Sequence, residues 1–119
     1  MENFKTGDLD IQAVDGTPVQ LLWKGKSNDR QPGKVLAPYF SQILAVVVER
    51  QVPLELHFEA LDHFNSSTIT AIIQLIQEAR QKKVKLAIVF DQKLKWQKLS
   101  FDALRVFVKG DDLLELRSV

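Results

Sequence analysis

Residues 54–90 read LELHFEALDHFNSSTITAIIQLIQEARQKKVKLAIVF, and this stretch decides the fold. Residues 54–58 alternate apolar and polar side chains, as a strand with one buried face does. Apolar residues then recur at helical spacing from about residue 66 to residue 81, and residues 84–90 are apolar and β-branched, as in an interior strand. A strand, a helix and a second strand in this order predict a parallel crossover within one sheet.

The chain before this stretch predicts a hairpin and a helix. Residues 9–14 and 19–23 have strand composition, and the Asp15-Gly16 turn between them predicts a β-hairpin. Residues 24–34 are polar and contain glycine and proline, which predicts a loop. From residue 35 to about residue 48 the apolar side chains follow helical spacing, so we expect a helix there.

The chain after the central stretch predicts one more helix and one more strand. We expect a charged loop at residues 91–98, a short helix capped by Ser100, and a last strand at residues 113–116. The expected order is therefore ββαβαβαβ. This order predicts an α/β fold in which helices pack on a single-layer mixed β-sheet, with residues 1–119 forming one domain.

Composition and charge exclude several classes of protein. The 119 residues are 45% hydrophobic and 26% charged, which is typical of a globular domain. The formal net charge of +1 gives no overall attraction to nucleic acid or anionic membranes. Without cysteine there can be no disulfide, thiolate nucleophile or cysteine-bound zinc. No apolar run approaches the roughly 20 residues of a membrane-spanning helix, so we expect a soluble, cytoplasmic protein.

Two motifs suggest enzyme chemistry but lack the context that it needs. Gly25-Lys26-Ser27 resembles the end of a phosphate-binding loop, but Gln20 stands where the first glycine should be, and no helix is expected to open at Ser27. His57 and His63 would lie roughly 20 Å apart along a strand, which is too far for one metal or catalytic site. We therefore expect no cofactor, no bound metal and no enzymatic activity.

The segment of residues 80–98 is rich in lysine and contains Trp96. Lysines pair with phosphates and aromatic rings stack on bases, so a nucleic-acid or ligand-binding module is the alternative function. A solvated helix end and loop would explain the same residues, and so would a basic rim that docks an acidic protein. The low net charge favours the solvated surface, and we do not expect nucleic acid to bind.

Asn65, Ser66, Ser67 and Thr68 stand together where the helix of the central stretch begins. Asparagine and serine are favoured N-caps, because the side-chain oxygen accepts from a free N–H of the first turn, for about 1 kcal/mol. One cap is enough, and we assign it to Asn65, although serine and threonine also occur in first turns for local reasons. A phosphate here would add about −1.5 to −2 charges at a helix end that stabilises anions. The hydroxyls of Ser66, Ser67 and Thr68 are therefore candidate phosphate acceptors.

These residues resemble two related families. A strand, a turn of the Asp-Ser-Ser type and an amphipathic helix are similar to the STAS domain of anti-sigma-factor antagonists. The turn at residues 64–68, FNSST, is more similar to that of the SiaC-like regulatory phosphoproteins, and residues 37–40, APYF, loosely match a second feature of that family. Thr68 replaces the glycine of the D-S-S-G form, and the basic loop at residues 93–98 matches neither family.

The resemblance implies a non-enzymatic regulator of a partner-switching pathway. Its partners would be a protein Ser/Thr kinase or an anti-sigma-type regulator, together with a phosphatase that removes the phosphate. Phosphorylation would change the surface that a partner reads and would leave the fold intact. Carried over by position, the resemblance implies that residues 1–119 form one STAS-like or SiaC-like domain and that Ser66 is the phosphate acceptor, with Ser67 and Thr68 as second choices. The partner-binding residues that the resemblance implies are Asp62, His63, Phe64, Asn65, Ser66 and Ser67.

Overall fold

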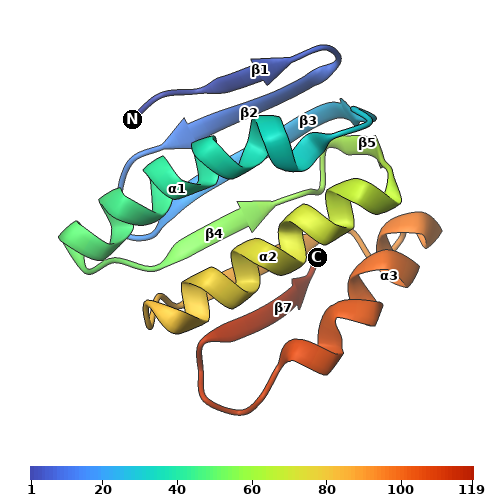
Figure 1. The fold of residues 1–119 in the computed structure, drawn as a ribbon. Helices are drawn as coiled ribbons and strands as arrows, with labels where there is room; N and C mark the ends of the chain where they lie inside the picture. Colours follow the sequence, from blue (N-terminus) through green and yellow to red (C-terminus); the bar gives the residue numbers. More distant parts are fainter.

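The computed structural model describes all 119 residues, which form one mixed sheet with helices packed on it (Figure 1). The strands are β1 (Phe4–Thr6), β2 (Leu9–Val14), β3 (Val19–Ser27), β4 (Leu54–His57), β5 (Leu61–Phe64), β6 (Leu86–Phe90) and β7 (Leu114–Ser118). The helices are α1 (Pro32–Arg50), α2 (Ser66–Gln81), α3 (Lys95–Asp102) and the short 3-10 helix η1 (Ala103–Phe107).

The strand order across the sheet is β1-β2-β3-β4-β6-β7, and β5 pairs with β3 beyond the end of β4. The two hairpin contacts, β1 with β2 and β2 with β3, are antiparallel. The contacts of β3 with β4, β4 with β6 and β6 with β7 are parallel, because each of these strands is reached through a helical connection. The predicted α/β class, mixed sheet and parallel crossovers are confirmed.

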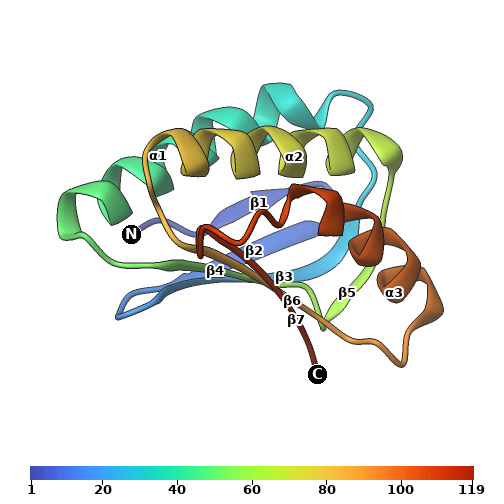
Figure 2. The same cartoon turned by 90° about the horizontal axis from the view of Figure 1, so that it is seen from below.

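Helices α1 and α2 lie on one side of the sheet, α3 lies beside the end of the sheet near β5, and the other side has no covering element (Figure 2). The core lies between the two layers and is built from alternate strand residues and one stripe of each helix. The buried stripe of α1 contains all the apolar positions that its spacing singles out. These positions are Leu36, Phe40, Ile43, Leu44 and Val47.

The predicted order ββαβαβαβ is wrong in that it omits two short strands, β1 and β5. Strand β1 has three residues with a single large apolar side chain, Phe4, which is too short for a periodic pattern. In β5 the two end residues are buried and Asp62 and His63 are exposed, so the apolar positions do not alternate. Strand β5 is held by its pairing with the end of β3.

The prediction was also wrong about residues 91–98, which do not form a loop throughout. Helix α3 begins at Lys95, and Ser100 lies inside it instead of capping it. The N-cap position is Leu94, which offers no side-chain oxygen, so the usual start signal is missing from the sequence. Other boundaries also differ: β3 continues to Ser27, α1 already begins at Pro32, β6 begins only at Leu86, and β7 continues to Ser118.

None of the helices combines the length and the apolar character that crossing a bilayer requires.

Candidate functional site

Asn65 caps α2, as predicted. Its Oδ1 accepts from the backbone N–H of Thr68 at 2.9 Å, and its backbone is extended, with φ −93° and ψ 172°. The other end of the same amide is also engaged, because Nδ2 donates to the carbonyl oxygen of Asp29 at 2.8 Å. Asn65 therefore joins the first turn of α2 to the loop between β3 and α1.

Thr68 is fully buried and holds the start of α2 against the end of β3. Its Oγ1 lies 2.7 Å from Asn65 Oδ1, to which it donates, and 2.7 Å from the hydroxyl of Ser27. Ser27 is itself buried, with 2% of its surface exposed. The hydroxyl of Thr68 is thus a structural group that solvent does not reach, which makes it the poorest phosphate acceptor of the three candidates.

Ser66 and Ser67 are exposed, and their hydroxyls make no hydrogen bond within the chain. The structure therefore divides the hydroxyl cluster into two parts. Asn65 and Thr68 hold the turn together, and Ser66 and Ser67 present free hydroxyls to solvent. The residue types alone do not reveal this division, because it depends on Ser27, a residue 41 positions away from Thr68.

Thr68→Val is expected to lower the free energy of unfolding by about 1–3 kcal/mol, because the similar shape is kept while a buried hydroxyl partner of Ser27 is lost. Urea unfolding followed by circular dichroism measures this change. Ser66→Val, which alters an exposed side chain with no partner, should change the same quantity by less than about 0.5 kcal/mol. Equal losses in the two variants would contradict the division of the cluster.

A pocket of about 360 Å³ lies between the first turns of α2 and the segment that leads into α1. Ser67 and Thr70 line one side, and Arg30 and Lys34 line the other. The first turn of α2 contains no acidic residue of its own, although Asp29 adjoins Asn65. Basic side chains therefore lie on the Ser67 side of the turn.

The residues that precede the turn divide between the surface and the core. Asp62 and His63 are exposed, whereas Phe64 is 7% exposed and packs among aromatic rings. The ring centres of Phe64 and Trp96 lie 5.2 Å apart, and those of His63 and Trp96 lie 6.4 Å apart. Phe64 thus acts as a core residue, and Trp96, which the sequence places in the basic segment, borders the candidate site.

The lysines of residues 80–98 do not gather into one patch. The buried strand β6 separates those at the end of α2 from those at α3, which puts them at opposite ends of the sheet. Several of the cations also have acidic neighbours, such as Lys82 with Glu78 at 3.3 Å and Lys98 with Asp102 at 2.7 Å. Residues 80–98 therefore offer no continuous basic surface for the alternative function, a nucleic-acid or ligand-binding module.

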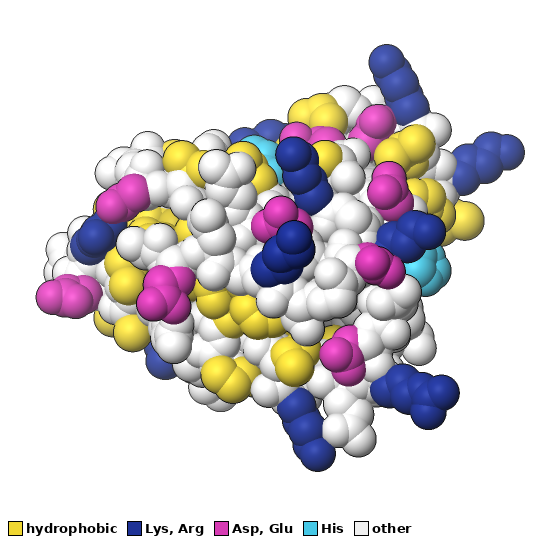
Figure 3. Space-filling view, turned by 90° about the horizontal axis from the view of Figure 1, so that it is seen from above, with side chains coloured by type: hydrophobic (Ala, Val, Ile, Leu, Met, Phe, Trp, Pro, Cys, Tyr) yellow, Lys and Arg dark blue, Asp and Glu magenta, His cyan; other side chains and the backbone are white.

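The face around β1, at the top of Figure 1, also carries charges of both signs (Figure 3). Basic and acidic side chains are interspersed there, in keeping with a formal net charge of +1.

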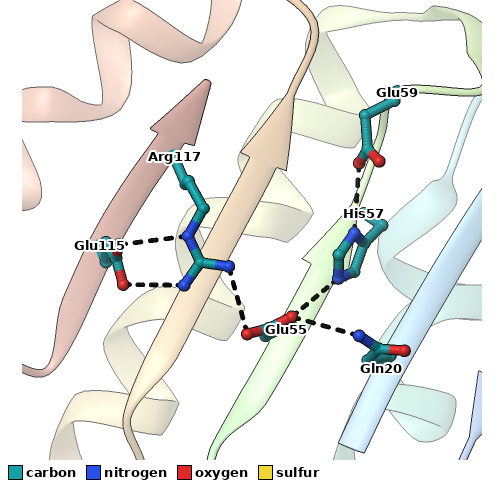
Figure 4. Close-up of polar contacts among 6 residues, drawn as sticks. All are labelled: Gln20, Glu55, His57, Glu59, Glu115 and Arg117. Carbon is teal, nitrogen blue, oxygen red and sulfur yellow. Dashed lines mark hydrogen bonds and ion pairs between the residues drawn. The ribbon is translucent and has the colours of Figure 1, made fainter. Parts of the chain in front are cut away.

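The uncovered face of the sheet carries a polar network that the sequence did not predict (Figure 4). His57 Nε2 donates to Glu55 Oε1 at 2.9 Å, and His57 Nδ1 lies 3.3 Å from Glu59 Oε1. Arg117 Nη1 reaches Glu55 Oε2 at 3.4 Å from β7, which lies two strands away from β4. The side chains meet only through the strand register, which places His57 beside Val89 and Val89 beside Arg117.

The charges in this network stabilise the ionised form of Glu55. Burial alone would raise the pKa of Glu55, but hydrogen bonds from His57 and Gln20 and the charge of Arg117 together hold it below its usual value. A pocket of about 350 Å³ opens beside His57 and Glu59. No group of three potential metal ligands occurs in the structure, and His63 takes no part in the network.

No protein-family model matches this chain, and neither does any curated protein. Membership of the STAS or SiaC-like families therefore stays a prediction from the residues of the turn.

Proposed function

We propose that this chain is a non-enzymatic regulatory protein of a partner-switching pathway, controlled by reversible phosphorylation of Ser66. The observation that carries the proposal is the free hydroxyl of Ser66 at the start of a capped helix. Asn65 and Thr68 make the side-chain contacts that hold the turn, and the hydroxyl of Ser66 makes none. A modification of Ser66 would therefore leave these contacts in place.

Electrostatics supports a phosphate at this turn. The N-terminus of α2 exposes unpaired backbone N–H groups, and the helix dipole favours a negative group there. Arg30 and Lys34 line the neighbouring pocket and add positive charge close to the turn. A phosphate would thus be stabilised in place while it reverses the sign of the local surface, which is what a protein partner would sense.

The partners would be a protein Ser/Thr kinase or an anti-sigma-type regulator and a phosphatase. Exposed Asp62 and His63 and half-buried Trp96 surround the turn and would contribute to the contact. Phosphorylation would weaken or redirect binding, because a doubly charged group must lose water to enter an interface built for a neutral hydroxyl.

Intact-mass measurement after co-expression with the cognate kinase tests the proposal. We expect one added phosphate on the wild-type chain and none on Ser66→Ala, with the circular dichroism spectrum unchanged in both. Ser67→Ala serves as the matched control and should still be phosphorylated. Ser66→Asp should bind the partner at least about tenfold more weakly than wild type, a difference of about 1.4 kcal/mol. A chain without phosphate at residues 65–68, or unchanged affinity of Ser66→Asp, would refute the proposal.

A further inference from the structure

Strand β7 forms one edge of the sheet, and no element of the chain pairs with its outer side (Figure 2). The opposite edge, β1, has only three residues, which is too short to pair strongly with another strand. Strand β7 has five residues, contains no proline and has no bulge in its pairing with β6. It lacks most of the features by which edge strands avoid pairing with other chains.

The hydrogen bonds to β6 show which backbone groups of β7 are free. Leu86 N–H donates to Leu113 O at 3.1 Å, and Val119 N–H donates to Phe90 O at 2.9 Å. In a parallel pair, residues of one strand alternate between facing the neighbour and facing away. The odd-numbered residues of β7 therefore bond to β6, and the N–H and C=O groups of Leu114, Leu116 and Ser118 point outward without a partner in the chain.

The side chains of this edge are complementary to themselves. Glu115 and Arg117 lie on the uncovered face of the sheet, where Arg117 donates to Glu115 of its own strand at 3.2 and 3.3 Å and also reaches Glu55 (Figure 4). Two copies of β7 can pair antiparallel about a two-fold axis at Leu116, which joins the outward-facing groups of both strands in about six backbone hydrogen bonds. In this register Glu115 faces Arg117 of the second copy, and Arg117 faces Glu115 of the second copy. A register centred on residue 115 or 117 would set like charges opposite each other.

We propose that β7 is a dimerisation edge, at which a second copy of this chain adds its own β7 and extends the sheet across a two-fold axis. Two cross-strand ion pairs select this register, because opposite charges directly across an antiparallel pair stabilise the pairing and like charges destabilise it. The pairing is isologous, so it closes at two copies and leaves no free β7 edge.

Sedimentation velocity over a range of protein concentrations tests whether the chain dimerises through β7. The wild-type sedimentation coefficient should rise from that of one copy to that of two. Arg117→Glu should weaken dimerisation by about tenfold or more, because two attractive pairs become two repulsive ones. Lys5→Glu makes the same change in net charge at the opposite edge of the sheet and should leave dimerisation unchanged. The double variant Glu115→Arg/Arg117→Glu exchanges the two charges and should restore dimerisation.

Two further variants separate pairing from folding and establish the register. Ser118→Pro removes an outward N–H that bonds nothing in one copy, so its thermal unfolding should match wild type while it stays monomeric. The chain has no cysteine, so Glu115→Cys and Arg117→Cys can be mixed and oxidised. The mixture should form cross-linked pairs, because the two Cα atoms would lie about 4.5 Å apart, and neither variant alone should do so.

A wild-type chain that remains monomeric at the highest concentration would overturn the proposal and leave the edge to a strand of another protein. It would also be overturned if Arg117→Glu dimerised as tightly as wild type, if the charge exchange failed to restore pairing, or if the mixed cysteine variants did not cross-link.

Discussion

Gly25→Ala is expected to remove more than about 4 kcal/mol of folding free energy, a large share of what a domain of this size possesses. Gly25 has a φ of +85°, a conformation that L side chains rarely adopt, and a Cβ at this position would lie 1.9 Å from the carbonyl oxygen of Asp8. That carbonyl belongs to the backbone and already accepts from Lys26 N–H at 3.0 Å. It cannot move aside without disturbing the pairing of β2 with β3.

Gly33→Ala is the matched control and should act in the opposite direction. No atom lies within 4 Å of a Cβ at Gly33, which sits in the first turn of α1 with an ordinary φ. Alanine favours a helix over glycine by up to about 1 kcal/mol, so we expect equal or greater stability. Urea unfolding of the two variants measures the difference. Similar midpoints for both would show that β2 does not constrain Gly25 in the way described.

The importance of Gly25 also explains the phosphate-loop resemblance of Gly25-Lys26-Ser27. Gly25 permits the close approach of β2, and Ser27 continues as strand and meets the hydroxyl of Thr68. The three residues therefore bring the end of β3 against the start of α2. Their similarity to a nucleotide motif arises from the needs of this junction, and they position the turn that carries Ser66.

The central crossover could be predicted from the sequence, because its signals are local and agree with one another. Helix α2 spans Ser66–Gln81, as its 3.6-residue periodicity indicates, and Asn65 caps it. The apolar run of β6 is buried on both faces, as an interior strand requires. Each of these features depends on residues within a few positions of each other, which is the range that a sequence pattern covers.

The remaining features depend on contacts between distant residues. Thr68 is buried because Ser27 meets it, and Glu55 joins a network because the sheet register brings Arg117 to it. Strand β5 exists because it pairs with the end of β3 after the chain bends away at the end of β4. Alternation at Glu55, His57 and Glu59 marks one face of a strand, but it does not say that this face stays uncovered.

Gln97→Leu is expected to lower the free energy of unfolding by about 2 kcal/mol or more, because each buried backbone group left without a partner costs about 1–3 kcal/mol. Gln97 is fully buried, and its amide contacts three backbone groups, of which Phe58 O also accepts from Leu61 N–H at 2.9 Å. Its Nε2 donates to Phe58 O at 2.7 Å and to Leu61 O at 3.1 Å, and its Oε1 accepts from Asp91 N–H at 2.8 Å. Leucine fills a similar volume but removes the partner that Gln97 supplies to Leu61 O and to Asp91 N–H.

Comparison with Gln97→Glu separates the loss of hydrogen bonds from the loss of packing. The carboxylate keeps the acceptor for Asp91 N–H but sets negative oxygens against the carbonyls of Phe58 and Leu61. The loss of unfolding free energy in Gln97→Glu, relative to wild type, should shrink as the pH falls, because the protonated acid can donate to one carbonyl. The deficit of Gln97→Leu should not follow pH in this way, and exposed Gln92→Leu should stay within about 0.5 kcal/mol of wild type.

The variant Gln97→Leu also connects the fold to the candidate site. Phe58 and Leu61 bracket the bend between β4 and β5, and β5 leads directly into Asn65 and the free hydroxyl of Ser66. If Gln97 holds this bend, amide hydrogen exchange in Gln97→Leu should accelerate at residues 61–68 more than at β2, which lies on the far side of β3. Uniform acceleration across the sheet would mean that Gln97 supports the whole core and has no particular role in presenting the turn.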